Sequence, residues 1–374
     1  MIHRILEDRM EQLLGSNKAL IIMGARQVGK STLLRTMLGE RNDVIWMNGD
    51  EPDIVQLFEN ISSTRLRSII GSNRFIVIDE AQRIPNIGLK LKLITDNVSG
   101  VQVIATGSSS FELSSKVNEP LTGRKREFRM LPLCFREMAE HTGLLDELRL
   151  IPHRLVYGYY PEVVNNAGDE RETLKELSDS YLYRDILSLD NISKPEKLIK
   201  LLQALAFQIG GQVSYSEIGK LIGLDPKTIE RYVDILEKSF IIFRLGSFNR
   251  NLRNELKNSR KIYFWDLGIR NAVIGNLSLV ENRTDAGALW ENFVISERMK
   301  KLSYASSFAT SWYWRTQQQK EIDYIEEEDG KLQAYEIKWN DRKATVKSPA
   351  TFSSAYPDAS FKVITPQNVE EFLL

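Results

Sequence analysis

The feature that most constrains the fold is a glycine-rich loop between a short apolar run and an amphipathic segment. The run ALIIM, residues 19–23, is typical of a buried parallel strand. The loop GARQVGKS, residues 24–31, fits the pattern G-x-x-x-x-G-K-[ST], and apolar residues at helical spacing follow it. Because strand, loop and helix succeed one another directly, the sequence predicts a parallel sheet with a phosphate-binding loop after its first strand.

Each residue type in the loop has a chemical reason. Gly24 and Gly29 allow a tight turn whose amides face phosphate oxygens, and the start of the next helix adds partial positive charge. Lys30 is expected to reach the β- and γ-phosphates, and the Ser31 hydroxyl is expected to ligate Mg²⁺, with Thr32 beside it in the binding loop. The sequence therefore predicts ATP and Mg²⁺ as cofactors.

Two further apolar runs end in polar residues. FIVIDE ends in Asp79, an expected ligand of the Mg²⁺ water shell, and Glu80, an expected general base for the attacking water. VQVIATGSSS ends in Thr106 and Ser108, which resemble the position in AAA+ ATPases that senses the γ-phosphate. The alternatives are a strand that simply exits to solvent with two charges, and ordinary turn chemistry at Thr-Gly-Ser.

The first region alternates strand-like and helical patterns. Strands are expected at 19–23, 43–47, 75–78, 101–105 and 126–131, with ligands at their carboxyl ends. A strongly basic stretch surrounds the last of them, and we expect Arg124 to act as an arginine finger on a neighbouring copy's nucleotide, which requires a homo-oligomer. The alternative is a solvated basic strand edge.

Five segments occur in an order that resembles a large prokaryotic family of predicted AAA+ ATPases related to archaeal ATPases. The resemblance covers nearly the whole chain and implies an α/β protein. It implies a P-loop NTPase domain with an AAA+/RecA-like parallel sheet, a helical and winged-helix region, and a small α/β nuclease-like domain. It gives architecture more than substrate. The segments are GARQVGKST, VIDEAQ, ATGSSS, LTGRKREFRMLPLCFREM and YGYYPEVV.

On this basis the chain is divided into an ATPase domain at 1–150, a helical linker or lid at 151–195, a winged helix-turn-helix at 196–255 and a restriction-endonuclease-like domain at 256–374. Within the third region, Ser214 and Pro226 are expected to begin two helices separated by a short turn, with a strand at 241–245 after them. Basic residues then cluster and suit phosphate contacts with DNA, although winged helices also serve as protein-binding modules. The basic residues are Arg244, Arg250, Arg253, Lys257, Arg260 and Lys261.

The C-terminal region contains EIDYIEEEDGKLQAYEIKWN, in which Asp323 precedes a turn and Glu336-Ile-Lys338 follows it. A helix bearing Glu291 and the pattern D–x₁₂–E–x–K resemble restriction-endonuclease-like nucleases, including archaeal Holliday-junction resolvases. The resemblance implies Asp323 and Glu336 as Mg²⁺ ligands, Lys338 as the cation that positions water, and Glu291 as an accessory ligand. The alternatives are a solvated hairpin and an inactive nuclease fold that only binds DNA.

Composition sets the outer limits. Lys plus Arg and Asp plus Glu number 50 each, so overall charge names no polyanionic partner. With a single cysteine, and with neither a signal peptide nor a membrane-length apolar run, we expect a cytoplasmic protein that does not contact membranes. The sequence predicts an ATPase that is coupled to DNA binding and to Mg²⁺-dependent cleavage or remodelling of DNA. One version of this hypothesis has branched DNA as the substrate. The competing hypothesis is a signalling or regulatory ATPase switch with an inactive C-terminal module.

Overall fold

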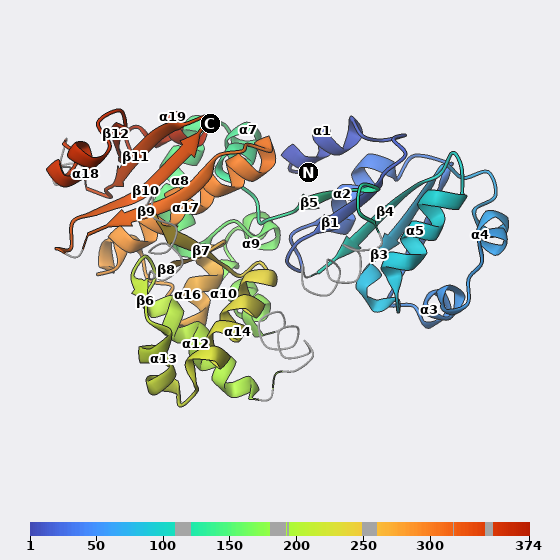
Figure 1. Ribbon diagram of the computed structural model, residues 1–374, viewed down its shortest axis with the longest axis horizontal. Helices are drawn as coiled ribbons and strands as arrows, with labels where there is room; N and C mark the ends of the chain where they lie inside the picture. Colours follow the sequence, from blue (N-terminus) through green and yellow to red (C-terminus); the bar gives the residue numbers. More distant parts are fainter. Residues whose placement is uncertain (109–120, 180–191, 193, 249–259, 317, 341–346) are drawn as a thin grey trace. The chain divides into compact units, whose positions relative to one another are not determined.

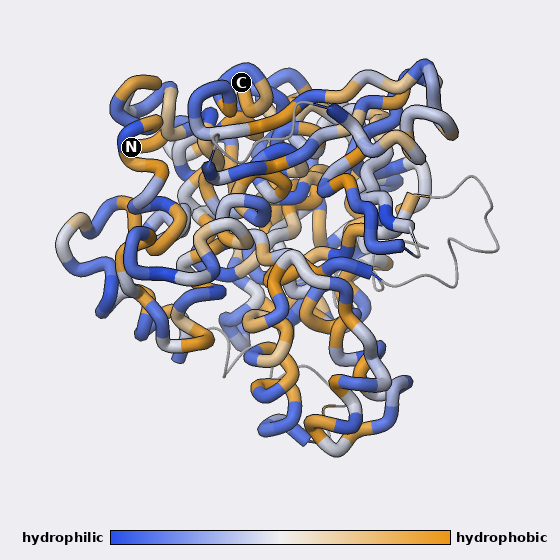
Figure 2. Tube along the Cα trace, turned by 90° about the vertical axis from the view of Figure 1, so that its left-hand side faces the viewer, coloured by the Kyte–Doolittle hydropathy of each residue, from blue (hydrophilic) through white to orange (hydrophobic). Residues whose placement is uncertain are grey.

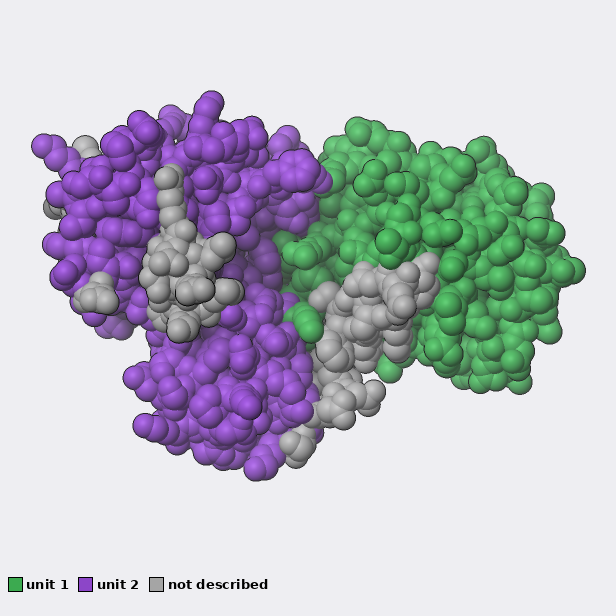
Figure 3. Space-filling model, in the orientation of Figure 1, with its two compact units in different colours: residues 1–132, 238–240 green, residues 133–237, 241–374 purple. Residues whose placement is uncertain are grey.

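A computed structural model describes residues 1–108, 121–179, 192, 194–248, 260–316, 318–340 and 347–374 (Figure 1). The chain forms two compact units, coloured separately in Figure 3. Unit 1 comprises Met1–Pro132 with Lys238–Phe240, and unit 2 comprises Leu133–Glu237 with Ile241–Leu374. In the described residues, no helix is long and apolar enough to span a membrane.

Unit 1 is built on a five-stranded sheet in the order β2-β3-β4-β1-β5, and every neighbouring pair is parallel. Strands β1, β3 and β4 are buried along their apolar residues, which explains why their sequences lack polar alternation. The predicted α/β fold with a parallel sheet is therefore confirmed. The elements are α1 (Ile5–Glu11), β1 (Ala19–Met23), α2 (Lys30–Leu38), β2 (Val44–Asn48), α3 (Pro52–Glu59), α4 (Ser63–Ile70), β3 (Phe75–Asp79), η1 (Ala81–Arg83), α5 (Ile87–Asn97), β4 (Gln102–Gly107) and β5 (Lys125–Arg129).

The register of this sheet brings the carboxyl ends of four strands level with one another. Met23 at the end of β1 is level with Gly107 at the end of β4, and Asn48 at the end of β2 is level with Asp79 at the end of β3. The residues that directly follow these strands must therefore lie near one another, as expected for a ligand site in a parallel sheet.

Unit 2 contains one seven-stranded mixed sheet in the order β12-β11-β10-β9-β7-β8-β6. Its central pair, β7 and β9, is parallel, whereas β7–β8, β9–β10 and β10–β11 are antiparallel. A single sheet thus contains strands from both of the regions between which the sequence predicts a domain boundary near residue 255. Its strands are β6 (Gln212–Val213), β7 (Ile242–Ser247), β8 (Arg260–Phe264), β9 (Thr310–Arg315), β10 (Glu321–Glu328), β11 (Lys331–Ile337) and β12 (Ser360–Ile364).

Helices precede, interrupt and follow these strands. The first group is α7 (Phe135–Thr142), α8 (Leu144–Tyr157), α9 (Pro161–Asn165), α10 (Glu170–Leu177) and α12 (Pro195–Phe207). The second is α13 (Tyr215–Ile222), α14 (Pro226–Lys238), α16 (Leu267–Val273), η3 (Val280–Asn282), α17 (Ala286–Ala305), α18 (Ala350–Ala355) and α19 (Val369–Leu373).

The α13–α14 segment has the local features that the sequence predicts. The Ser214 side chain accepts a hydrogen bond from the Glu217 amide at the start of α13, and Gly223 ends this helix in the left-handed conformation. Asp225 caps the Thr228 amide at the start of α14. Figure 2 shows hydrophilic and hydrophobic residues interspersed along the chain, and in α14 the buried stripe includes Ile229.

Candidate functional site

The loop after β1 depends on two glycines for its path. Gly29 has a φ of 96° and precedes the first residue of α2. A Cβ atom at Gly24 would lie 2.1 Å from the carbonyl oxygen of Met130, so no larger residue fits there. Both glycines are therefore required by the backbone itself, independently of any ligand.

Lys30 is folded back into the loop that it follows. Its Nζ donates hydrogen bonds to the carbonyl oxygens of Gly24, at 3.0 Å, and Ala25, at 2.8 Å, and the side chain is buried. The ammonium thus lies inside the loop, where phosphate oxygens would compete with two neutral carbonyls. Because hydrogen bonds between charged partners are stronger, a bound phosphate is expected to draw this ammonium away from them.

A hydroxyl–carboxylate pair joins the start of α2 to the end of β3, two strands away from β1. Ser31 Oγ donates to Asp79 Oδ2 at 2.6 Å, and the Thr106 hydroxyl donates to Asp79 Oδ1. Mg²⁺ prefers oxygen ligands of this hard type, so Ser31 and Asp79 fit the predicted ion. The structure brings these predicted residues together; their roles toward nucleotide and metal stay predictions.

Glu80 occupies a constrained position beside this pair. Its backbone is left-handed, with φ 48°, and its amide donates to Thr106 Oγ1 at 3.1 Å. Gln82 Nε2 donates to Glu80 Oε2 at 2.6 Å and to Ser108 Oγ at 3.1 Å. Sequence reasoning missed Gln82, although its position two residues after the acidic pair could have suggested it. A Cβ at Gly49 would lie 2.4 Å from the Glu80 carbonyl oxygen, which explains glycine there.

Arg124 lies at the opposite end of the parallel strands, where they begin. It directly precedes β5, and its carbonyl oxygen accepts from the Ala19 amide at the start of β1. Its guanidinium forms an ion pair with Asp96 at 2.6 Å. The length of β1, roughly 15 Å, separates this end of the strands from the phosphate-binding loop. Arg124 therefore cannot reach the nucleotide of its own copy. The predicted role on a neighbouring copy stays a prediction.

In unit 2, three predicted residues meet on neighbouring strands. Asp323 lies on β10, Glu336 on β11, and Lys338 just after β11. Lys338 Nζ lies 2.6 Å from Glu336 Oε1 and 3.6 Å from Asp323 Oδ2. Asp323 also accepts a hydrogen bond from the Ile337 amide at 2.8 Å. These side chains face one another, so the hairpin is not merely a solvated one.

Glu291, on α17, lies near the same place. It is held by Tyr263, which sequence reasoning missed, and by Lys261, which sequence reasoning assigned to DNA. Its Oε1 accepts from Lys261 Nζ at 2.9 Å and from the Tyr263 hydroxyl at 2.6 Å, and both donors lie on β8. Lys261 also pairs with Glu321 at 2.5 Å. We call Lys261, Glu291, Glu321, Asp323, Glu336 and Lys338 the carboxylate–lysine cluster.

Burial dominates the electrostatics of this cluster. It raises the pKa of Glu291 to about 7, because lost hydration outweighs the attraction of Lys261, and the charge of Asp323 adds to the rise. The pKa of Glu336 is also raised, first by burial and then by Asp323. Burial alone would lower the pKa of Lys261, but Glu291, Asp323 and Glu321 together raise it above its ordinary value.

The lysines occupy much of the space between these carboxylates. In the described ranges of the chain, no three His, Cys, Asp or Glu side chains are grouped so that they could hold a metal ion. The predicted scheme, with Asp323 and Glu336 as ligands and Glu291 as an accessory ligand, stays a prediction. Two ammonium groups, those of Lys261 and Lys338, offset part of the charge of the four carboxylates.

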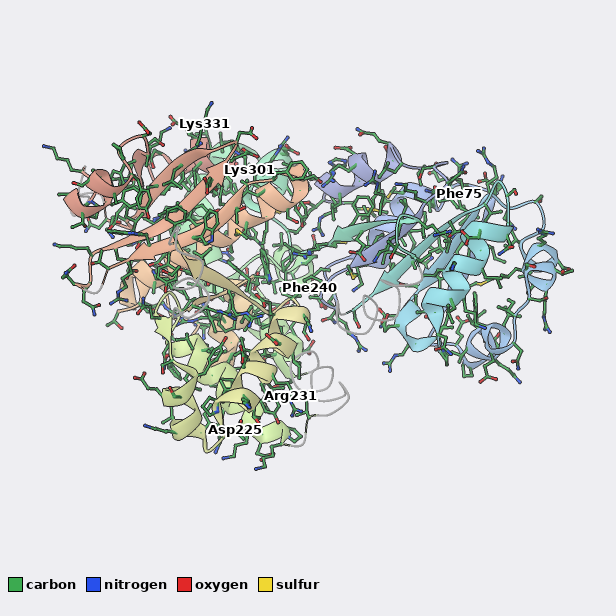
Figure 4. All side chains as sticks on the ribbon, in the orientation of Figure 1. Phe75, Asp225, Arg231, Phe240, Lys301 and Lys331 are labelled. Atoms are coloured by element: carbon green, nitrogen blue, oxygen red, sulfur yellow. The ribbon has the colours of Figure 1, made fainter. Side chains whose placement is uncertain are left out.

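The basic segment after α14 differs from expectation. Arg244 is bound by Glu237 and Asp234, and Lys261 is buried in the carboxylate–lysine cluster, so neither is available for a phosphate. The prediction that these two residues contact DNA is therefore wrong. Arg250, Arg253 and Lys257 lie outside the described residues. On α14 the exposed residues include Lys227, Glu230 and Arg231, so its charge is mixed, and Figure 4 labels Arg231 there.

Comparison with known proteins defines the class of unit 1. Residues 16–139 match an AAA domain family, AAA_14, so the chain contains a P-loop ATPase domain of the AAA type. Residues 148–279 match a domain of unknown function, DUF8612, and residues 286–371 match another, DUF4143.

Two prokaryotic relatives align over most of this chain and over a smaller share of their own length. An uncharacterized protein of Mycobacterium tuberculosis is 26% identical over 358 residues, which cover 94% of this chain and 76% of the relative. An uncharacterized protein of Methanocaldococcus jannaschii is 23% identical over 320 residues, covering 80% and 70%. Among solved structures, the Walker-type ATPase of Pyrococcus abyssi has a TM-score of 0.51 at 16% identity, covering 73% of this chain and 96% of that one. The last similarity shows a shared fold.

Proposed function

We propose that unit 1 hydrolyses ATP with Mg²⁺, and that Glu80 is the general base. The observation that carries the proposal is the contact between Ser31 and Asp79 at 2.6 Å, directly beside Glu80. In this proposal the Ser31 hydroxyl and the Asp79 carboxylate bind the metal, and the carboxylate of the next residue, Glu80, serves the attacking water. When bound, Mg²⁺ would polarise the phosphate oxygens and offset their charge.

The chain's own residues divide the remaining work. The loop amides and Lys30 bind and orient the phosphates, and Thr106 holds Asp79 in place. Glu80 accepts the proton of the attacking water. Gln82 orients the carboxylate of Glu80 by donating hydrogen bonds to it and to Ser108.

Steady-state ATP turnover and nucleotide binding test this proposal. Lys30→Ala should abolish binding, whereas Glu80→Gln should still bind ATP but turn over at least a hundredfold more slowly, within the range of general-base contributions. Glu59→Gln, on the exposed end of α3, is the matched control and should behave as wild type. Unchanged turnover in Glu80→Gln would remove Glu80 as the base.

A second function is favoured by the carboxylate–lysine cluster. We propose that unit 2 binds DNA through the α13–α14 segment, which has the order of a winged helix-turn-helix, and that Asp323, Glu336 and Lys338 support Mg²⁺-dependent cleavage of the phosphodiester backbone. Support comes from the close approach of Lys338 to both carboxylates. In this scheme Asp323 and Glu336 would hold the ion and Lys338 would orient the attacking water.

Cleavage of linear and branched DNA at low salt, with and without Mg²⁺, tests this second function. Lys338→Ala and Asp323→Asn should abolish cutting while ATP turnover persists. Lys331→Ala is the matched control, because Lys331 is exposed at the opposite end of β11 (Figure 4). DNA binding without cutting would leave an inactive module in an ATPase switch. Absence of both would refute the DNA proposal without touching the ATPase.

A further inference from the structure

A buried arginine at the start of the chain connects the phosphate-binding loop with the end of unit 1. Arg4 is only 6% exposed. Its Nη1 donates to the carbonyl oxygen of Val28, inside the loop, and its Nη2 donates to the carbonyl oxygen of Leu131, each at 2.7 Å. One planar guanidinium therefore bridges two backbone segments, a geometry that a lysine cannot reproduce.

The backbone of Met130 lies against the other end of the same loop. Its amide donates to the Met23 carbonyl oxygen at 2.7 Å, and its own carbonyl oxygen occupies the space where a Cβ of Gly24 would be. Gly24 thus lies directly against Met130, and Val28 is linked to Leu131 through Arg4. Met130 and Leu131 are both fully buried. A change in the loop cannot occur without a response from this dipeptide, because close-packed interiors transmit displacement.

The chain leaves unit 1 directly after this contact. Pro132 is the last residue of the unit's first segment, and Leu133 is the first residue of unit 2. Within unit 2, the Leu133 carbonyl oxygen accepts from Lys300 Nζ at 2.9 Å, and the Phe135 amide donates to Glu297 at 2.6 Å. Lys300 and Glu297 belong to α17, the helix that also carries Glu291.

We propose that Met130–Leu131 is the element through which unit 1 passes its nucleotide state along the chain, and that Arg4 is the positioning residue that fixes this element to the phosphate-binding loop. The inference rests on the ATP binding proposed above and adds to it a route toward α17. Arg4 touches neither nucleotide nor metal; it acts through the carbonyl of Val28.

Ligand entry supplies a reason for movement. Lys30 holds two loop carbonyls, those of Gly24 and Ala25, which it must release to bind phosphate. The loop backbone then adjusts at Gly24, against which Met130 packs, and at Val28, which Arg4 holds. Met130 and Leu131 are held within unit 1, and Leu133 and Phe135 are held by α17. Because only Pro132 lies between Leu131 and Leu133, a shift of Leu131 is passed to Leu133 rather than absorbed by a flexible linker.

Hydrogen exchange of the full-length wild-type protein tests the route. Spectra are taken without nucleotide, with ADP and Mg²⁺, and with ATP and Mg²⁺. We expect nucleotide to protect residues 24–31 and to change exchange in residues 129–136 by about threefold or more. Protection of the loop with no change in residues 129–136 would overturn the inference while leaving ATP binding intact. Absence of protection anywhere would mean that the proposed ATP binding itself has failed.

Variants of Arg4 separate a positioning role from a merely structural one. Arg4→Gln should weaken nucleotide binding on the order of tenfold, as expected for lost charged hydrogen bonds, and should remove the response in residues 129–136 at saturating nucleotide. Arg4→Lys should restore part of the affinity but not the response. Arg65→Gln, on the exposed face of α4, is the control and should match wild type.

Wild-type affinity together with a preserved response in Arg4→Gln would overturn the role of Arg4. If Arg4→Gln does not fold, the comparison of Arg4→Lys with wild type at saturating nucleotide decides the question, since a full response in Arg4→Lys contradicts the proposed bridge.

Discussion

At the scale of single residues, Asp79 shows how the candidate nucleotide site is held before any ligand arrives. Both of its carboxylate oxygens accept hydrogen bonds from hydroxyls, one from Ser31 and one from Thr106. Thr106 also accepts from the Glu80 amide, so a single hydroxyl orders two neighbouring acidic residues. Thr106 thus positions both residues, and its expected role in sensing the γ-phosphate stays a prediction.

Replacing Thr106 by valine should therefore impair turnover while the protein stays folded. Valine keeps the shape but removes one of the two hydroxyl donors of Asp79 and one of the two acceptors of the Glu80 amide. We therefore expect kcat to fall on the order of tenfold. Thr106→Ser keeps the hydroxyl and should retain most of the activity. Equal turnover in the valine variant and wild type would show that Asp79 is held adequately by Ser31 alone.

Glu291 predicts a pH dependence for the stability of unit 2. Burial raises the pKa of Glu291 to about 7 from 4.5, so between these values the folded protein holds a proton that the unfolded chain has lost. The contribution of this group to stability is therefore present below pH 4.5, falls as the pH rises to about 7, and stays flat above that pH. The total change is on the order of 1–3 kcal/mol.

Urea unfolding in EDTA at pH 5 and pH 7.5 measures this effect. Other buried acids also titrate, so the informative quantity is the difference between wild type and Glu291→Gln, which lacks the titrating group. Wild type should lose more stability than the variant over this interval. Parallel pH profiles for the two proteins would contradict the assignment.

At the scale of elements, helix α13 is stabilised by the residue that caps its start. Ser214 accepts from the Glu217 amide at the start of α13, and helix caps of this kind contribute about 1 kcal/mol. Ser214→Ala should lower the free energy of unfolding of unit 2 by that amount in a denaturant titration, and Ser214→Asp should restore it. If alanine is neutral, packing of the buried face of α13 suffices without the cap.

Sequence reasoning worked where a pattern is local. The apolar runs that became β1 and β3, and the loop between β1 and α2, have motifs whose residues lie within a few positions of one another. The same holds for Ser214 and Pro226, which act on the helices that they begin. These features could be read because steric and hydrogen-bond requirements of the backbone act over short distances.

Partners that are distant in sequence could not be predicted. Lys261 was expected to contact DNA in a basic segment, yet it is buried and paired with Glu291 and Glu321. Both partners are needed because an unpaired ammonium inside the fold would be too costly. Arg4 gave no pattern at all, because its partners are carbonyl groups that every residue carries. Composition and spacing reveal side-chain types, whereas such contacts depend on which segments the tertiary fold brings together.

At the scale of the whole molecule, the two compact units predict two unfolding transitions. The seven-stranded sheet joins β6 with β12, so the regions on either side of residue 255 should unfold together rather than separately. Calorimetry with ATP and Mg²⁺ at about one hundred times the dissociation constant should stabilise unit 1 by about 2.7 kcal/mol. Lys30→Ala should lose this shift, and a third transition would show that unit 2 is divided.

Arg124 makes a separate prediction about assembly. If it acts on a neighbouring copy, Arg124→Ala and Glu80→Gln should each be inactive alone, but mixing them should restore activity. In a dimer, random mixing gives up to about a quarter of wild-type turnover, because half of the dimers then contain one complete site. ATP turnover of the mixture measures it, and activity no greater than that of the separate variants would exclude a shared site.

The parallel pairing of β7 with β9 has a consequence for how the chain is made. Gly246 on β7 pairs with Trp312, which is synthesised more than sixty residues later. Until then one edge of β7 has no partner strand, and such an edge readily pairs with other chains. At about 5–20 residues per second, that interval lasts several seconds in a translating ribosome. Newly made protein is therefore most prone to aggregation before β9 has been synthesised. The completed sheet removes that risk because β8 and β9 then pair with the two sides of β7.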